Sequence, residues 1–195
     1  KAGAKLKFAS EPFCFAEYVF STSSDKRLVI GASLNDSFYS IREDIVKYYA
    51  GGVVLEFIKK FAKEEIISVD MFFLLVDTLK KLAYTDENAK KITIKFLLSA
   101  LKIVGYELNV KKCQGCGNEI SGRTFFNFLN GCFYCEKCFN GDGREISNET
   151  FQTLKNIENG DFLEENLNKS LKLIDFYINN RIEEKISAIK ELVAL

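Results

Sequence analysis

The sequence predicts a mainly α-helical protein with small β parts, which places it in the α+β class. Three observations lead to this prediction. Apolar residues recur at helical spacing from Asn35 onward, two short β-rich runs precede that point, and a cysteine- and glycine-rich segment interrupts the helical pattern at 111–145. We therefore expect a small β part over residues 1–34 and a helical domain over 35–195 that contains the cysteine segment as an insertion.

The composition fits a folded chain and excludes several kinds of function. The 195 residues are 47% hydrophobic and 28% charged, as in typical globular proteins. Histidine is absent, which excludes Ser-His-Asp and Cys-His catalysis and histidine-ligated metals. The longest apolar run, Met71–Val76, is too short for a membrane span. The formal charge is zero, with a slight positive excess before residue 113 and an equal negative excess from there on. Nucleic-acid-binding proteins usually carry a clear basic patch, so this charge is weak support for such a function.

The first part of the chain contains two candidate strands. Pro12–Phe20 and Arg27–Gly31 are rich in aromatic and β-branched residues, and the polar segment Ser21–Lys26 predicts a turn between them. Because two strands do not form a stable sheet alone, they resemble the end of a β domain whose earlier strands precede Lys1. We accordingly expect the chain to be a fragment, and we expect the isolated Cys14 to serve in core packing.

Five helical segments follow these strands. They are Phe38–Phe61, Val69–Leu82, Asn88–Val104, Ser147 to about Glu158, and about Glu164 to Leu195. Ser68 and Ser147 are suitable N-caps, either Asp86 or Asn88 can open the third helix, and Gly105 can end it in a left-handed conformation. The pair Gly51-Gly52 lies inside the first segment, where it either breaks the helix or permits close packing. The sequence does not decide between these two.

The cysteines form the most specific motif. Cys113 and Cys116 make one C-x2-C knuckle, and Cys135 and Cys138 make a second one 18 residues further on. This spacing is typical of a structural zinc site, because zinc prefers four thiolates in a tetrahedron and each knuckle supplies two. Gly115 and Gly117 are small enough for the first knuckle to wrap tightly around a metal.

Cys132 offers a rival second knuckle, Cys132-x-x-Cys135. The Asn130-Gly131 dipeptide predicts a two-residue hairpin turn in which Leu129 pairs with Cys132 and Phe126 pairs with Cys135. Cys132 would then lie at the hairpin tip and Cys135 at the end near the first knuckle. We therefore expect Cys113, Cys116, Cys135 and Cys138 to hold one Zn²⁺ and Cys132 to remain free. A disulfide module and free buried thiols are the alternatives.

Several segments resemble the RecO family of bacterial recombination mediators. The similar segments are Lys5–Tyr18, Phe38–Asp44, Leu101–Leu108 followed by Cys113, Gly131–Cys135, and Glu184–Leu192. Gly131–Cys135 is similar to the family's segment before the third zinc ligand, which also favours Cys135 and Cys138 as ligands. The first half of the family's N-terminal OB barrel has no counterpart here.

The resemblance implies a fold and a function. Residues 1–34 would be the C-terminal part of an OB-fold domain, followed by a helical bundle with an inserted zinc ribbon. The protein would be a non-enzymatic, cytoplasmic, nucleoid-associated mediator that binds single- and double-stranded DNA, anneals complementary strands and loads recombinase with a RecR-type partner. It would also dock on the C-terminal tail of single-strand-binding protein. The family's zinc is structural rather than catalytic.

Two sets of lysines are candidate contacts, and solvated surface is the alternative for each. The candidate DNA contacts are Lys1, Lys5, Lys7, Lys111 and Lys112. The candidate contacts for an acidic partner tail are Lys80, Lys81, Lys90, Lys91 and Lys95, which would rim an open groove between the second and third helices. A different function, a zinc-ribbon protein-interaction module of a transcription or translation factor, remains open, and an enzyme is a third alternative.

Overall fold

A computed structural model describes residues 6–23, 26–61, 68–160 and 163–195. Its elements are, in chain order, η1 (Lys7–Ser10), β1 (Phe15–Ser23), β2 (Lys26–Asp36), η2 (Tyr39–Arg42), α2 (Ile45–Phe61), α3 (Val69–Tyr84), α4 (Ala89–Ile103), β3 (Thr124–Asn127), β4 (Cys132–Cys135), β5 (Arg144–Ile146), α5 (Asn148–Lys155), α6 (Glu165–Tyr177), η3 (Ile178–Ile182) and α7 (Ser187–Ala194). Helices predominate and the sheets are small and antiparallel, which confirms the predicted α+β class.

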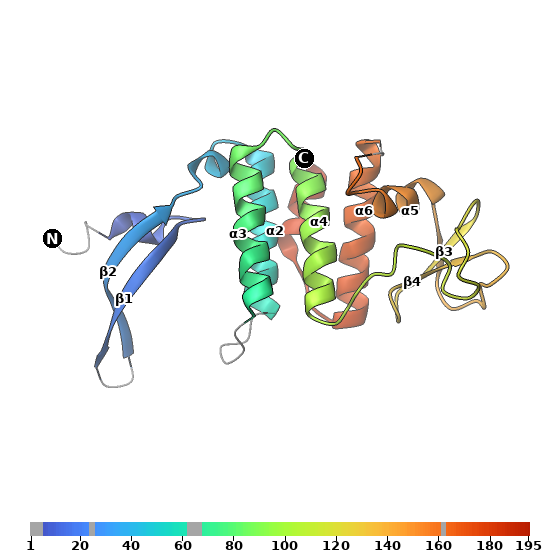
Figure 1. The fold of residues 1–195 in the computed structure, drawn as a ribbon, viewed down its shortest axis with the longest axis horizontal. Helices are drawn as coiled ribbons and strands as arrows, with labels where there is room; N and C mark the ends of the chain where they lie inside the picture. The colour runs from blue at the N-terminus through green and yellow to red at the C-terminus, as the bar shows by residue number, and fades with distance from the viewer. Residues whose placement is uncertain (1–5, 24–25, 62–67, 161–162) are drawn as a thin grey trace.

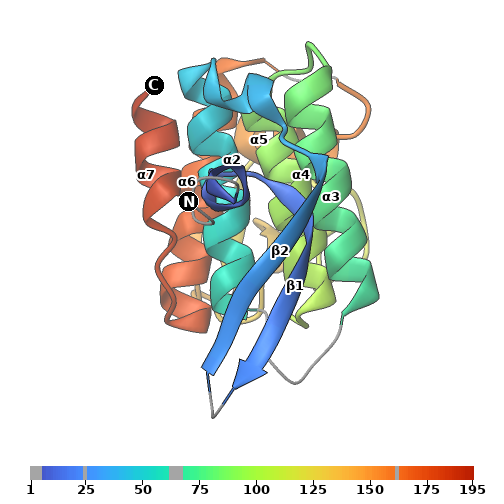
Figure 2. The same cartoon turned by 90° about the vertical axis from the view of Figure 1, so that its left-hand side faces the viewer.

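The elements form three parts in a row. The β1–β2 hairpin lies at one end, the helical bundle in the middle, and the cysteine ribbon with strands β3, β4 and β5 at the other end (Figure 1). Within the bundle, α2 packs against α3, α4 and α7, while α6 packs against α4, α5 and α7. The view along the long axis shows the hairpin crossing in front of the bundle (Figure 2). None of the helices in the described ranges is long and apolar enough to cross a membrane.

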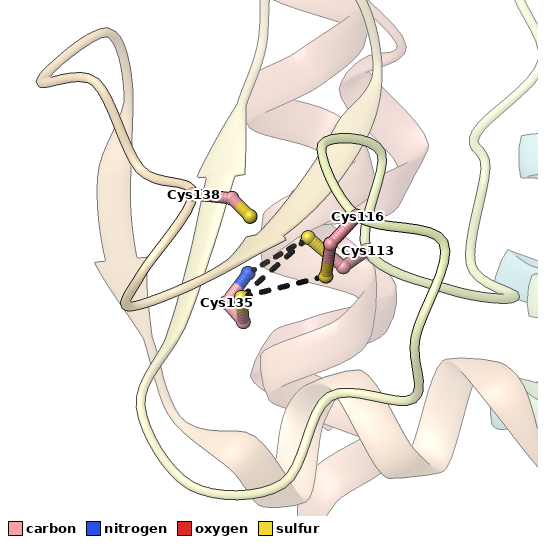
Figure 3. A group of neighbouring side chains, drawn as sticks. All are labelled: Cys113, Cys116, Cys135 and Cys138. Carbon is pink, nitrogen blue, oxygen red and sulfur yellow. Dashed lines mark hydrogen bonds between the residues drawn. The ribbon is translucent and has the colours of Figure 1, made fainter.

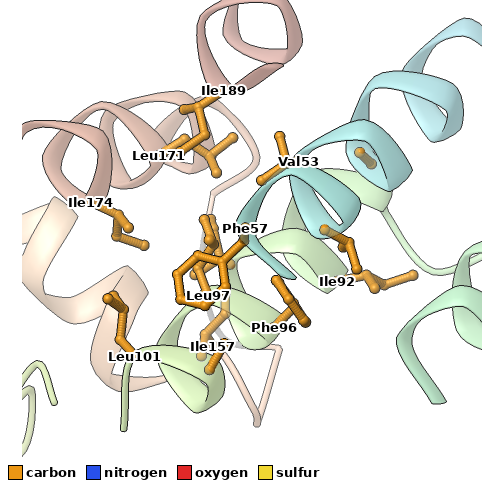
Figure 4. Close-up of a cluster of buried hydrophobic side chains, with 14 of the residues drawn as sticks. Val53, Phe57, Ile92, Phe96, Leu97, Leu101, Ile157, Leu171, Ile174 and Ile189 are labelled. Carbon is orange, nitrogen blue, oxygen red and sulfur yellow. The ribbon is translucent and has the colours of Figure 1, made fainter. Parts of the chain in front are cut away.

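The bundle core is assembled from the apolar faces of the helices α2 to α7, and its central part lies between four of them. Buried side chains of α2, α4, α6 and α7 meet between the helices, together with one from the turn after α5 (Figure 4). They include Val53, Phe57, Leu97, Leu101, Ile157, Leu171, Ile174 and Ile189. Phe57 meets Phe96 edge to face, with ring centroids 5.7 Å apart, so that aromatic contacts tie α2 to α4.

The predicted helix boundaries are confirmed where a local cap defines them. The Ser68 hydroxyl accepts from the Met71 N–H, and the Ser147 hydroxyl accepts from the Thr150 N–H. Asn88, rather than Asp86, opens α4, because its side chain accepts from two N–H groups of the first turn. Gly105 ends α4 in a left-handed conformation, with φ of 83°.

The first predicted helix, Phe38–Phe61, is wrong at its start. The chain forms the short turn η2 and then begins α2 only at Ile45. Asp44 explains this restart, because its carboxylate accepts from the N–H groups of Val46 and Lys47 and so acts as a local cap.

The Gly51-Gly52 pair does not break α2 but allows close packing. A Cβ at Gly51 would lie 2.6 Å from the ring of Phe13, while one at Gly52 would lie 3.6 Å from Ala188. Phe13 therefore packs directly on the backbone of α2, and through this contact the base of the hairpin is attached to the bundle.

The single amphipathic region predicted from about Glu164 to Leu195 is two helices. Its predicted apolar face is confirmed, since Leu167, Leu171, Ile174 and Ile178 are all buried. After Tyr177 the chain forms the π-helical turn η3, and Glu183 then takes a left-handed conformation, with φ of 61°. This break redirects the chain, and α7 packs back on α2 and α6.

The β1–β2 hairpin extends further than the predicted strands. β1 continues to Ser23 and β2 begins at Lys26, so the strands reach into the predicted turn Ser21–Lys26, and residues 24–25 lie outside the described residues. Pro12 and Phe13 precede β1 rather than belonging to it. Most of the hairpin's large apolar side chains are exposed, namely Tyr18, Val19, Phe20, Leu28, Val29, Ile30 and Leu34. Its assignment to an OB barrel stays a prediction.

Candidate metal centre

The ribbon hairpin has a different register from the predicted one. Asn127 pairs with Cys132 and Thr124 pairs with Cys135, so four residues rather than two form the turn. The reason is a side-chain cap: the Asn127 Oδ1 accepts from the Leu129 N–H at 2.9 Å, and the Asn130 Oδ1 accepts from the Cys132 N–H at 3.0 Å. Cys132 still lies near the tip and Cys135 at the far end of β4.

The four predicted ligands are brought together by two separate turns. Cys113 and Cys116 come from the loop after α4, Cys135 from the end of β4 and Cys138 from the turn that follows, and their sulfurs face one another (Figure 3). All four Sγ atoms lie within 4.8 Å of each other. Cys132 does not belong to this group, since its buried thiol donates to the Asn130 carbonyl at 3.4 Å.

The spacing of the sulfurs fits a tetrahedral zinc ion. A Zn–S bond of about 2.3 Å in a tetrahedron places neighbouring sulfurs about 3.8 Å apart. The Sγ atoms of Cys113 and Cys135 are 3.7 Å apart, and those of Cys116 and Cys135 are 4.0 Å apart. Four thiolates this close repel one another unless a cation lies between them, so the donor set suits a divalent soft metal.

The backbone around Cys113 favours the thiolate form of this one cysteine. Burial raises the pKa of the Cys113 thiol, but backbone N–H groups of Cys135 and of its own knuckle lower it more, to about 6. The Cys135 N–H donates to the Cys113 sulfur at 3.3 Å. A Cβ at Gly115 would lie 2.7 Å from the Cys138 Cβ, so only glycine lets the two knuckles approach this closely.

Aromatic rings fix the ribbon to the bundle. Phe126 of β3 contacts Phe133 of β4, with ring centroids 4.8 Å apart, and Phe133 in turn contacts Phe151 of α5 at 5.0 Å. Phe126 also meets Tyr177 of α6 edge to face at 5.9 Å. The ribbon and the helices therefore share one apolar core, and the metal centre is held in a fixed position relative to α5 and α6.

The candidate DNA-contact lysines lie in separate parts of the molecule. Lys7 is exposed in η1, and Lys111 and Lys112 are exposed in the loop between α4 and the ribbon. Lys1 and Lys5 lie outside the described residues. The hairpin and the ribbon stand at opposite ends of the molecule (Figure 1), so the two clusters do not form one patch.

The candidate partner lysines form intramolecular contacts instead of rimming one groove. Lys81 pairs with Asp77 at 2.7 Å, Lys91 pairs with Glu87 at 2.7 Å, and Lys90 donates to the Asn168 side chain at 2.8 Å. Lys95 lies 3.1 Å from Glu87 and 3.3 Å from Glu158. Only Lys80 stays exposed on α3 without a described ion pair.

An apolar groove does exist where the first turns of α3 meet the ends of α2 and α4 and the turn η3, but these lysines do not line it. It has a volume of about 660 Å³, and its walls include Met71 and Leu75 of α3 and Val104 after α4. Its cation is Lys60, which pairs with Glu184 at 2.9 Å.

Sequence reasoning missed a second cluster of cations. Arg144 of β5 and Lys169 and Lys172 of α6 line one groove where the ribbon meets the bundle. Arg144 is 25 or more positions from the two lysines and shares no motif with them, so the available signal is the pair of lysines three residues apart on a helix.

Comparison with known proteins gives a family. Residues 42–188 match the family model described as "Recombination protein O C terminal". The match begins at η2, ends at the start of α7, and includes the four cysteines.

Curated relatives agree with this match. The chain is 26% identical over 179 residues to "DNA repair protein RecO" of Caldicellulosiruptor bescii, covering 91% of this chain and 71% of the relative. It is 26% identical over 137 residues to the protein of the same name from Acetivibrio thermocellus, covering 70% of this chain and 55% of the relative. The corresponding protein of Clostridium novyi is 24% identical over 196 residues, covering 95% of this chain and 75% of the relative.

Proposed function

The chain belongs to the RecO family of DNA repair proteins, and from this premise we propose that it is a non-enzymatic, DNA-binding recombination mediator. The observation that carries the proposal is the family match over residues 42–188, which spans both the bundle and the ribbon. The proposed activity is annealing of complementary strands and loading of recombinase together with a RecR-type partner. Annealing needs binding of two strands and no bond chemistry, which suits a chain without histidine.

We further propose that one structural Zn²⁺ is held by Cys113, Cys116, Cys135 and Cys138. All four positions of a tetrahedron would then be occupied by protein sulfurs, and no open position would remain for a substrate. The metal would supply a cross-link between the two knuckles and no catalytic step. Its support for function is indirect: it fixes the loop that carries Lys111 and Lys112.

The DNA contacts of the proposal are the exposed lysines at both ends of the molecule. Lys7 and the Lys111-Lys112 pair would neutralise phosphates and release counterions on binding. A chain with zero formal charge should bind weakly and in a strongly salt-dependent way.

The proposal includes docking on the acidic tail of single-strand-binding protein. Lys80 is the candidate with a free charge among the described lysines of α3 and α4, whereas Lys90, Lys91 and Lys95 are held by neighbouring side chains. A labelled tail peptide should therefore lose affinity when Lys80 is changed to Glu. A binding curve unchanged by Lys80→Glu would remove α3 from this role. The proposed cellular location is the bacterial cytoplasm, at the nucleoid.

Strand annealing with the 195-residue chain tests the central proposal. Two complementary labelled oligonucleotides should anneal faster in its presence, and the effect should fade as salt rises. Changing Lys111 and Lys112 to Ala should lower the log–log salt slope of single-strand binding by about 0.7 for each lost phosphate contact. No binding and no annealing at low salt would reject the mediator role and favour a zinc-ribbon module that binds protein.

A further inference from the structure

A groove with an apolar floor lies where the ribbon meets α6, towards the ribbon end of the molecule in Figure 1. Its volume is about 370 Å³. Phe126, Ile146 and Leu173 form much of its lining, and Phe128 and Phe176 meet edge to face there with ring centroids 5.4 Å apart. Phe128 and Phe176 are only half-buried, so part of each ring is open to solvent.

Three cations surround this floor. Arg144, Lys169 and Lys172 all line the groove and are exposed. Lys172 forms no ion pair within the described part of the chain, and the Lys169 amine has only an amide partner, Asn166, at 3.3 Å. The Arg144 guanidinium lies over the Phe176 ring, 4.8 Å from its centroid, so it is fixed in place without being neutralised.

The one carboxylate in the lining is already engaged. Glu145 accepts two hydrogen bonds from Arg123, at 2.9 Å and 2.7 Å, and Arg123 also pairs with Glu136. This bidentate contact lowers the pKa of Glu145 and pairs its negative charge with the guanidinium of Arg123. The groove therefore presents a surplus of positive charge, and its complementary ligand is an anion with an apolar or aromatic part.

Single-stranded nucleic acid combines these two features in every nucleotide. Its phosphates need a row of cations, and its unpaired bases stack on aromatic rings. A duplex offers phosphates but hides its bases, so it would use only the cations. Lys169 and Lys172 are three residues apart on α6 and thus neighbours on one helix face, which places two charges side by side along the groove.

We propose that this groove is a single-stranded DNA subsite in which Arg144, Lys169 and Lys172 hold phosphates and one unpaired base lies against Phe128 and Phe176. The inference rests on the proposed DNA-binding function and deepens it, because it assigns a contact surface apart from Lys7 and the Lys111-Lys112 pair. The subsite lies between the ribbon and the bundle, so both parts contribute to binding the DNA strand.

The absence of tryptophan provides a direct test. Phe128→Trp introduces one fluorophore into the groove, and Phe73→Trp introduces one at an exposed position of α3 as a control. Oligothymidylate should quench the tryptophan at position 128 and leave the one at position 73 unchanged, because only a stacked base quenches. An abasic strand of equal length should bind without quenching. Quenching by an acidic peptide but not by oligothymidylate would overturn the inference.

Charge reversal gives a second, independent readout. Lys172→Glu and Lys59→Glu change the net charge equally, but Lys59 is exposed on α2, outside the groove. We expect Lys172→Glu to weaken oligothymidylate binding about tenfold and Lys59→Glu less than about twofold. Equal effects of the two variants, in a chain that still binds and anneals DNA, would overturn the subsite and leave the proposed function intact. Failure of the unmodified chain to bind any strand would reject both.

Discussion

The molecule carries a small β structure at each end of the same helical bundle, and the two differ in how much of themselves they bury. The ribbon has three short strands, a cluster of four sulfurs and rings that reach into the helical core. The hairpin has two longer strands, yet most of its large side chains face solvent. Strand length therefore does not decide how much of each β structure is buried.

The difference lies in what each part packs against. Phe133 of the ribbon is completely buried between rings of β3 and α5, whereas Phe20 of the hairpin is 52% exposed. The hairpin contacts the bundle mainly at its base, through Phe13 on α2 and through Phe15, whose ring lies 6.0 Å from that of Phe72. The ribbon is thus part of the helical domain, and the hairpin is an attachment to it.

Loss of the proposed zinc ion should have the largest effect, and it should be confined to the ribbon end. Cys116→Ser leaves three thiolates without their fourth partner, and because zinc binding and ribbon folding share one free energy of about 10 kcal/mol or more, residues 111–145 should unfold. Zinc content should fall from one per chain to near zero, and limited proteolysis should cut within 111–145. Cys132→Ser is the matched control and should keep its zinc. A Cys116→Ser protein with full zinc content would contradict the ligand assignment.

Truncating one ring in each β part should lower the free energy of unfolding by very different amounts. The two variants should differ by several kcal/mol. Phe133→Ala removes a completely buried ring and should lower the free energy of unfolding by about 3–5 kcal/mol. Phe20→Ala removes a half-exposed ring and should change it by about 0.5 kcal/mol or less. Urea unfolding followed by circular dichroism measures both. Similar values for the two variants would show that a surface covers Phe20 in solution.

Local signals made the helices and the clustering of the four cysteines predictable. Ser68, Asn88 and Ser147 cap their helices through side chains two or three residues from the N–H groups they satisfy, so a short window of sequence contains the whole interaction. The C-x2-C spacing works in the same way, since each knuckle places two sulfurs by itself. The resemblance to the RecO family, which the comparisons confirm, was likewise visible in short segments.

Features in which two local signals compete, or which depend on distant contacts, were not predictable. The Asn127 cap changed the hairpin register by two residues, although Asn130-Gly131 alone favours a tighter turn. The break at Glu183 follows no glycine or proline. The sequence suggested that the α4 lysines are unpaired and line a groove. In the structure Lys91 pairs with Glu87, which precedes the helix, and Lys95 pairs with Glu158, which is distant along the chain.

Adding one methyl group at the base of the hairpin should have an intermediate effect. Gly51→Ala would place a Cβ 2.6 Å from the Phe13 ring, and the resulting overpacking should cost about 1–3 kcal/mol. Gly52→Ala is the neighbouring control, because its Cβ would make an ordinary 3.6 Å contact with Ala188 and should stabilise α2 by about 0.5–1 kcal/mol. In urea unfolding, the two variants should change the free energy of unfolding in opposite directions. A shared sign would mean that Phe13 does not rest on Gly51.

The smallest expected effect concerns the ion pairs of the α4 lysines, which Glu87 forms just before the helix and Glu158 forms from the turn after α5. Glu87 accepts from Lys91 at 2.7 Å and from Lys95 at 3.1 Å, and Lys95 also reaches Glu158. Burial raises the pKa of the Glu87 carboxyl, but the two lysines lower it more, so its pKa in the folded state is below the usual value. The folded state therefore favours the charged carboxylate, and the resulting stabilisation is present at neutral pH and disappears as the pH falls through that lowered pKa.

Glu87→Gln should accordingly reduce the free energy of unfolding at pH 7 by about 0.2–1 kcal/mol, the range for partly exposed pairs. The difference between variant and wild type should shrink as the pH falls through the lowered pKa of Glu87, because the wild-type carboxylate then becomes protonated as well. Asp77→Asn removes the more exposed pair with Lys81 on α3 and should cost less than Glu87→Gln. A pH-independent cost for Glu87→Gln would show that the side chain acts through packing.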